Sequence, residues 1–367
     1  DAGETDSATY TVKVVSDSGN KYRFNDFGSS AVTLDLAEGG TYTFDQSDSS
    51  MSSHPMQLSE TANGTHGGGS AYSTGVTYEL DGSTVTASAF ISGFSSASSR
   101  KLIITVASSA PTLYYYCYYH SGMGGQANTN TTLGSSNFDG TIQSRVKANT
   151  TAGFSIVTYT GNHTSGATVG HGLGATPSAF IVKARGTPNS QNRNWNIYHV
   201  KVGNTKYLQF TASAQATNSA WWNDTSPNST TFTLGNDYDV NANVSGGDYI
   251  AYCFSEVAGY SKFGNFGGSG NSNGPFVFLG FRPRWIMYKA INDGQNWIVY
   301  DTSRLGYNDR NDALQPSNED AEITNANIDI LSNGFKLRNG LGVSNGGGIV
   351  YIYFAFAESP FKNSRAR

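Results

Sequence analysis

Short segments in which apolar and polar residues alternate recur along the whole chain of 367 residues, separated by Gly, Ser, Asn and Asp. Such alternation is typical of β-strands that bury one face. No stretch has the apolar spacing of an amphipathic helix of three turns or more. The clearest strands of the N-terminal third are Thr9–Val15, Ala31–Leu36, Thr41–Phe44 and Leu102–Val106. We therefore predict an all-β protein built from β-sandwiches.

Four segments of the C-terminal part occur twice, in the same order. Residues 153–155, 177–183, 194–198 and 249–256 reappear at 259–261, 283–289, 296–300 and 351–358, so the offset changes only from 106 to 102. Ordered matches at a nearly constant offset indicate an internal duplication. Two tandem sandwiches and one larger sandwich of two similar halves both fit this pattern.

The last matched strand predicts how each copy packs. Because side chains alternate along a strand, Ile250, Tyr252 and Phe254 share one face, and the second copy has Ile352, Phe354 and Phe356 there. We expect this face to form the core. Cys253 then lies on the opposite face as a small packed residue, where the second copy has Ala355.

Composition changes divide the chain into four parts. The first sandwich covers residues 1–127. The stretch from Gln126 to Gly140 is polar, so residues 128–152 are expected to be a linker and a connecting strand. The two copies of the duplication follow as residues 153–258 and 259–367.

Charge and hydropathy exclude several classes of protein. Charged residues make up 14% of the chain and the net charge is −4, so no basic excess exists for nucleic acid. The longest apolar run, residues 349–357, is far shorter than the roughly 20 residues that a membrane helix needs. No glycine-rich phosphate loop and no zinc-protease His-Glu-x-x-His motif is present. We therefore predict a protein that is not an enzyme and does not insert into membranes.

One group of residues has the chemistry of a copper site. Cys117, His120 and Met123 form a Cys-x2-His-x2-Met loop directly after the strand 111–116, and His54 follows an earlier strand. A thiolate, two imidazoles and a weak axial thioether are the donor set that copper favours. A single loop can turn Cys, His and Met toward one point, and His54 can approach from another strand.

Residues 9–125 resemble a cupredoxin. The resemblance rests on the stretch 34–44 with Glu38-Gly39-Gly40 at its turn, one early histidine, and a tyrosine-rich strand that runs into the Cys/His/Met loop. It implies a cupredoxin-like sandwich with copper as cofactor. Carried over by position, the implied ligands are His54, Cys117, His120 and Met123.

The remaining histidines and one pair of tryptophans lie outside this group of residues. His66, His163, His171 and His199 lie in polar contexts without partner spacing, so we expect them at the surface. Trp221 and Trp222 are adjacent in a polar loop, and two neighbouring indoles rarely point into one core. We expect one of them to face solvent and to stack on a sugar ring or an apolar patch of a partner.

A second resemblance concerns residues from about 150 to 367, which look like a repeated jelly-roll-like β module of structural proteins in marine bacteriophages. The residues that carry it are 153–162, 169–174, 333–338 and 354–361. It implies a virion appendage such as a tail fibre or capsid-surface fibre, located on the virion surface or outside the cell. Its partners would be other virion proteins, further copies of the chain, and a host surface glycan or protein. The basic tail 362–367 adds to the expectation of self-association.

Two other functions stay open on the sequence alone. The first is a secreted or surface blue-copper protein that transfers electrons through Cys117 and its partners. The second is a carbohydrate-binding module that uses Trp222.

Overall fold

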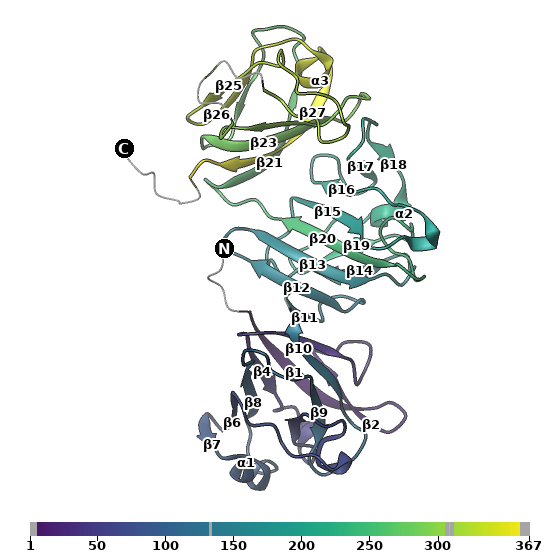
Figure 1. Cartoon of the computed structure of the whole chain (residues 1–367), viewed down its shortest axis with the longest axis vertical. Coiled ribbons are helices and arrows are strands. Elements are labelled where there is room, and N and C mark those ends of the chain that lie inside the picture. Colours follow the sequence, from purple (N-terminus) through teal and green to yellow (C-terminus); the bar gives the residue numbers. More distant parts are fainter. Residues whose placement is uncertain (1–5, 132–133, 305–307, 309–311, 360–367) are drawn as a thin grey trace. The chain divides into compact units, whose positions relative to one another are not determined.

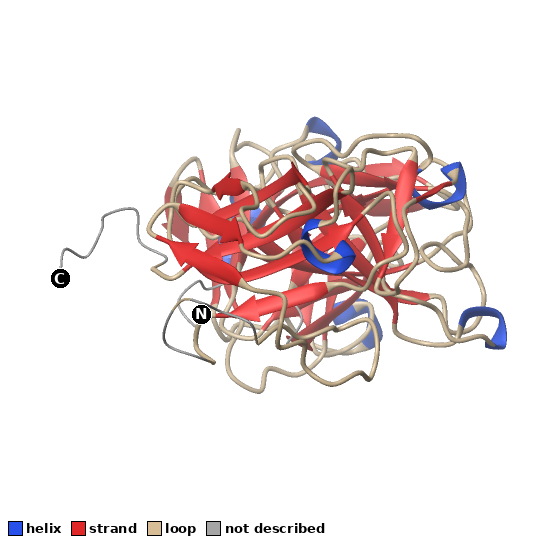
Figure 2. Ribbon diagram, turned by 90° about the horizontal axis from the view of Figure 1, so that it is seen from above, coloured by secondary structure: helices blue, strands red, loops and turns tan. Residues whose placement is uncertain are grey.

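The computed structural model describes residues 6–131, 134–304, 308 and 312–359, so the predicted tail 362–367 and the end of the last repeat motif lie outside the described residues. The all-β prediction is confirmed, and strands dominate in Figure 2. The α-helices described are short: α1 (Ala87–Gly93), α2 (Ser219–Trp222) and α3 (Gly342–Asn345). None of the described helices has the length and apolarity needed to cross a membrane.

The chain divides into two compact units. Unit 1 comprises residues 1–148, 156–159 and 168–172, and unit 2 comprises residues 149–155, 160–167 and 173–367. The strands β13 (Phe154–Thr160) and β14 (Ala167–Gly170) have residues in both units.

Unit 1 contains two main sheets (Figure 1). The order in the six-stranded sheet is β2 (Asn20–Phe24), β1 (Ser7–Ser16), β4 (Thr41–Asp45), β8 (Arg100–Thr105), β6 (Val76–Leu80) and β7 (Ser83–Val85). The order in the four-stranded sheet is β3 (Leu34–Ala37), β10 (Gly125–Thr131), β9 (Leu113–Cys117) and β5 (Met56–Ser59). The pairs β1–β4 and β3–β10 are parallel, and the other pairs are antiparallel. A further antiparallel pair is β11 (Ser135–Asn137) with β12 (Ser144–Asn149).

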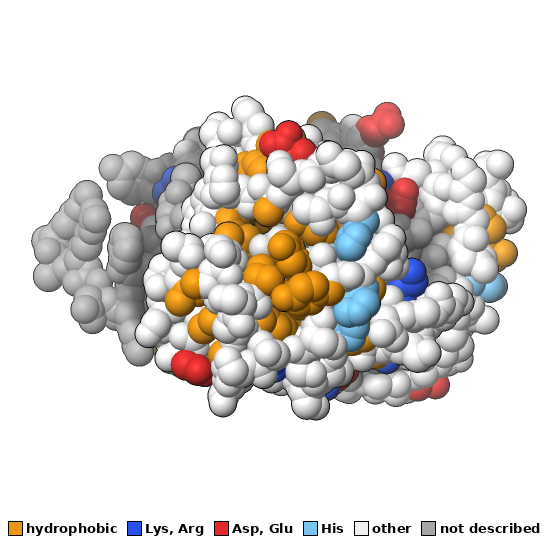
Figure 3. Space-filling view, turned by 90° about the horizontal axis from the view of Figure 1, so that it is seen from below, with side chains coloured by type: hydrophobic (Ala, Val, Ile, Leu, Met, Phe, Trp, Pro, Cys, Tyr) orange, Lys and Arg blue, Asp and Glu red, His pale blue; other side chains and the backbone are white. Residues whose placement is uncertain are grey.

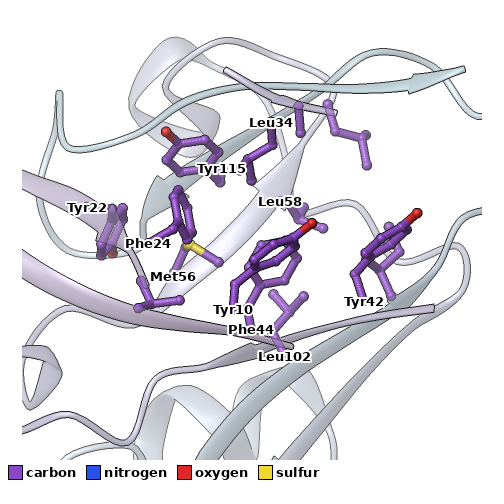
Figure 4. Packing of buried hydrophobic residues seen from close by; sticks show 14 of the residues in the cluster. Tyr10, Tyr22, Phe24, Leu34, Tyr42, Phe44, Met56, Leu58, Leu102 and Tyr115 are labelled. Atoms are coloured by element: carbon purple, nitrogen blue, oxygen red, sulfur yellow. The ribbon is translucent and has the colours of Figure 1, made fainter. Parts of the chain in front are cut away.

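The core of unit 1 is rich in aromatic rings from both sheets (Figure 4). Tyr42 and Phe44 are fully buried and alternate with the half-buried Thr41 and Thr43 along β4, as one-sided burial requires. Tyr115 of β9 faces them from the other sheet and contacts the edge of Phe24 at a ring distance of 5.1 Å. Unit 1 is therefore a β-sandwich.

The stretch 128–152, expected as a linker and a connecting strand, begins inside a strand of the sandwich of unit 1. Gly125–Thr131 form β10, which hydrogen-bonds between β9 and β3. Its polar side chains have partners: Thr129 Oγ1 donates to the carbonyl of Ala110 at 2.8 Å, and Asn128 Nδ2 donates to Asp35 at 2.9 Å. A polar side chain can lie inside a sandwich when its polar group is paired. Composition alone therefore does not show that the chain continues as a strand of unit 1 beyond residue 127.

The two copies of the duplication are called repeat 1 and repeat 2, and unit 2 contains most of repeat 1 and all of repeat 2. The strands of repeat 1 in unit 2 are β15 (Ala179–Ala184), β16 (Asn196–His199), β17 (Lys206–Gln209), β18 (Ala216–Thr217), β19 (Thr231–Leu234) and β20 (Asp248–Phe254). Repeat 2 has one sheet of β21 (Ser261–Gly267), β27 (Val350–Ala357), β23 (Pro283–Ala290) and β24 (Ile298–Asp301). Its second sheet consists of β22 (Phe276–Phe278), β26 (Gly334–Leu337) and β25 (Ile328–Leu331).

The two repeats make the same contacts at matching positions. Lys183 Nζ donates to the carbonyl of Arg193, and Lys289 Nζ donates to the carbonyl of Gln295. The strand register of the two repeats also agrees. Ala179 of β15 lies opposite Phe254 of β20, and the matching Trp285 of β23 lies opposite Phe356 of β27. The Tyr249 hydroxyl donates to the Tyr238 carbonyl and accepts from Ala242 N, and the Tyr351 hydroxyl likewise bridges Gly342 and Gly346.

In repeat 2, the face of the last strand that was expected to form the core packs against repeat 1 and not inside the sandwich of repeat 2. In repeat 2 the opposite face, with Tyr351, Tyr353 and Ala355, packs on the second sheet and forms the sandwich core. Ile352 and Phe354 instead belong to a second cluster that includes Ile197 and Leu208 of repeat 1. The prediction is confirmed for Ile352 and Phe354, which are buried in this cluster, because both faces of β27 are apolar and buried. It is wrong for repeat 1, where Ile250, Tyr252 and Phe254 are only half-buried.

In repeat 1 the corresponding core face carries Tyr249, Ala251 and Cys253, all fully buried, so Cys253 is the small packed residue that was expected. Its neighbours include Phe180, whose ring lies 4.8 Å from Phe232 of β19. Each repeat thus has buried packing of its own, and the cluster around Phe354 joins the two repeats.

Candidate metal centre

The four candidate ligands come from two neighbouring strands of the four-stranded sheet. Cys117 is the last residue of β9, and Met56 at the start of β5 lies directly opposite it. His54 stands two residues before Met56, so the sheet register carries it to the end of β9. His120 and Met123 follow in the loop between β9 and β10, here named the ligand loop (Cys117–Met123).

The structure brings three of these side chains together. The Cys117 Sγ lies 3.5 Å from His120 Nδ1 and 3.9 Å from His54 Nδ1. The ligand atoms of all three residues lie within 4.8 Å of one another, and the two imidazole rings are 4.6 Å apart. Met123, the fourth candidate, is buried in the core of unit 1. In the part of the chain that the structure describes, no other group of three His, Cys, Asp or Glu residues meets in this way.

Tyr22 ties two of the candidate ligands to the core. Its hydroxyl donates to the carbonyl of His54 at 2.9 Å, and its backbone N–H donates to the carbonyl of Met123 at 3.0 Å. Tyr22 itself is fully buried, and burial raises the pKa of its hydroxyl well above the usual value. It therefore stays a neutral donor at every physiological pH.

The electrostatics favour His54 in the form that binds metals. Burial, helped by the nearby His120, lowers the pKa of His54, so its imidazole is neutral at physiological pH. A neutral imidazole is the form that coordinates a metal ion. Because no carboxylate joins the cluster among the described residues, the donor set is one of nitrogen and sulfur, which suits copper rather than calcium or magnesium.

The site opens to solvent on the side of His120. Cys117 is buried and His54 is partly buried, but His120 is exposed. Next to it are two exposed aromatic side chains, Tyr118 and Tyr119, whose rings meet edge to face at 5.0 Å. Figure 3 shows hydrophobic and histidine side chains side by side on one surface.

Two residues near the site were missed by the sequence analysis. His66, expected to be an isolated surface residue, is exposed, but its Nε2 lies 3.1 Å from the carbonyl of Cys117. Asn63 hydrogen-bonds with the ligand loop at two places. The Asn63-Gly64 dipeptide is a turn signal, but nothing in the sequence shows which loop that turn contacts.

The expectation for Trp221 and Trp222 is wrong, because both indoles are buried. They form the end of α2, where Trp221 stacks on Tyr207 at a ring distance of 3.8 Å and donates its Nε1–H to Asn196. Trp222 meets Phe180 edge to face at 4.9 Å. A one-turn helix separates the two side chains enough for both to be buried, so neither offers a free face to a sugar.

Two of the histidines expected at the surface are buried as well. His199 lies in unit 2, where its Nε2 donates to the carbonyl of Tyr353 at 3.2 Å and its Nδ1 accepts from the backbone N–H of Lys201. Burial lowers the pKa of His199 to about 4. His171 is also fully buried, whereas His163 is partly exposed.

Fold and site together define an all-β protein whose first sandwich carries a cluster of one thiol and two imidazoles, the donor set of a candidate metal site. The chain belongs to a family described as a domain of unknown function (DUF7483), whose model matches residues 126–360. The match begins inside β10, so the four candidate ligands precede it. No curated protein and no solved structure matches the chain.

Proposed function

We propose that unit 1 binds a copper ion through His54, Cys117, His120 and Met123. The observation that carries the proposal is the approach of a buried thiol to two imidazoles from separate segments, at 3.5 and 3.9 Å. When bound in such a donor set, copper supplies one-electron redox chemistry.

The strand order of unit 1 supports the same proposal. The ligand loop connects two adjacent strands, β9 and β10, and the His54 segment enters from β5 on the other side of β9. The pairing of β5 with β9 therefore sets the distance between His54 and the ligand loop. This arrangement agrees with the resemblance of residues 9–125 to a cupredoxin.

Titration of the purified protein with Cu(II) tests the proposal. We expect saturation at one equivalent and an intense visible band from charge transfer between the Cys117 thiolate and the metal. Cys117→Ser should abolish the band. Cys253→Ala is a matched control, because it removes the other cysteine and places there the residue that repeat 2 has at the same position. A wild-type protein that stays colourless and binds no copper contradicts the proposal.

A structural role is the second candidate, and it concerns unit 2. Both faces of β27 are buried, one in the sandwich core and the other between the repeats, so unit 2 has the features of a rigid spacer. Together with the resemblance to bacteriophage structural proteins, this favours a non-enzymatic virion appendage that carries unit 1. Detection of the chain in purified virions, and oligomers by mass photometry, would support this role. A monomer at micromolar concentration that is absent from virions would contradict it.

A further inference from the structure

We propose that Asn63 is a positioning residue that holds the ligand loop in its metal-binding conformation. The inference rests on the proposed copper site and adds a residue to it. Asn63 lies at the start of the short 3₁₀ turn Gly64–Gly67, more than fifty residues before the loop that it contacts.

One side chain satisfies two groups of the loop. Asn63 Nδ2 donates to Ser121 Oγ at 2.8 Å, and Asn63 Oδ1 accepts from the backbone N–H of Gly122 at 2.8 Å. Ser121 and Gly122 are the two residues between His120 and Met123. A shift of either residue would move both ligands, so these two bonds fix the part of the loop that matters most for metal binding.

The turn that carries Asn63 is itself held against the strand of Cys117. Gly64 lies directly against the ring of Tyr116, the residue before Cys117, and leaves no room there for a Cβ atom. From the same turn, His66 Nε2 lies 3.1 Å from the carbonyl of Cys117. The turn therefore contacts the loop at its start and near its end, and Asn63 makes the contact between His120 and Met123.

The backbone conformation explains why asparagine suits this position. Asn63 has φ of 61°, a left-handed conformation that asparagine and glycine adopt more readily than other residues. Glycine tolerates the conformation but has no side chain to bond the loop. The only other side chain hydrogen-bonded to Gly122 among the described residues is that of Lys21, which reaches its carbonyl.

The experiment compares copper binding in three variants with the wild type. Asn63→Gly keeps the left-handed backbone and removes both hydrogen bonds, so we expect copper affinity to fall by about 10-fold or more, as when other outer-shell partners of metal ligands are lost. Asn63→Asp keeps an acceptor for Gly122 and for the Ser121 hydroxyl, so it should restore most of the affinity. Asn189→Gly makes the same change at an exposed left-handed residue of unit 2 and should have no effect.

A second measurement needs no metal. In the copper-free protein, amide hydrogen exchange at Gly122 should be faster in Asn63→Gly than in the wild type, and near wild-type in Asn63→Asp. If the wild type binds copper but Asn63→Gly binds it equally tightly with the same visible band, the positioning role is wrong and the copper site stands. If the wild type binds no copper, the proposed function fails, and the positioning role fails with it.

Discussion

Tyr22 links the candidate metal site to the packing of unit 1 by a single buried hydroxyl. Tyr22→Phe removes the hydrogen bond to the carbonyl of His54 and the contact of the Tyr22 hydroxyl with the Cys117 side chain, and it keeps the ring in the core. We expect unit 1 to lose about 1 kcal/mol of stability, the usual worth of one internal hydrogen bond. Because His54 then has more freedom, copper should bind several-fold more weakly.

The measurements for Tyr22→Phe are denaturant unfolding and copper titration. Tyr115→Phe is the control, since its hydroxyl also donates to a backbone carbonyl, that of Val32, but this carbonyl holds no candidate ligand. An equal loss of copper affinity in both variants would show that Tyr22 acts through stability alone.

His199 makes unit 2 sensitive to acid. Its pKa is lowered to about 4 in the folded state and is near 6.5 when unfolded, so the unfolded chain takes up a proton first as the pH falls. Its contribution to stability is fully present above pH 6.5 and is lost progressively down to pH 4. The loss is on the order of 3 kcal/mol.

His199→Gln removes this titration while an amide nitrogen can still reach the carbonyl of Tyr353. The difference in unfolding free energy between wild type and variant should therefore shrink as the pH is lowered from 7 to 4. A difference that stays constant over this range would mean that His199 does not titrate between the folded and unfolded states.

At the scale of elements, β27 is the strand on which unit 2 depends. Phe354 is buried between the repeats, where its ring lies 5.5 Å from Phe263 and 5.2 Å from His199. Phe354→Ala should destabilise unit 2 by about 3–5 kcal/mol, as expected for a large cavity. Phe278→Ala, in the same repeat but 57% exposed, should cost less than about 1 kcal/mol.

Thermal or urea unfolding of both variants checks this prediction. Similar effects of the two substitutions would mean that the contact between the repeats adds little to the stability of unit 2. In that case the repeats would be sandwiches that fold independently.

The elements also show how far the sequence could be interpreted. Alternation predicts the strands well because one-sided burial leaves a clear pattern, as in Tyr42 and Phe44 of β4. It is less informative for β10, where Thr129 is buried and Asn128 is half-buried with their polar groups paired, and for β27, whose two faces are both apolar and buried. Spacing within one loop reveals Cys117, His120 and Met123 as a set, and the structure places Cys117 and His120 side by side.

Neither alternation nor spacing in the sequence predicts contacts between loops that are far apart in the chain. Asn63 and Tyr22 meet the ligand loop only because β2 and the turn before residue 68 are folded against β9. The adjacent Trp221 and Trp222 predicted a loop with one exposed ring, but they lie in the single turn of α2, and both are buried.

At the scale of the whole molecule, the tryptophans allow the two units to be observed separately. All five, Trp195, Trp221, Trp222, Trp285 and Trp297, lie in unit 2, and unit 1 has none. The wavelength of tryptophan emission therefore reports on unfolding of unit 2, whereas far-ultraviolet circular dichroism reports on both units.

Copper should stabilise unit 1 and leave unit 2 unchanged, because a ligand stabilises only the folded part that binds it. At a free copper concentration 100 times the dissociation constant, the gain is about 2.7 kcal/mol if the unfolded chain binds no metal. We expect the circular dichroism transition of unit 1 to move to higher denaturant while the tryptophan transition of unit 2 stays in place. Cys117→Ser should remove the shift, and Cys253→Ala should keep it. A copper-dependent shift of the tryptophan transition that persists in Cys117→Ser would instead place metal binding away from the His54, Cys117 and His120 cluster.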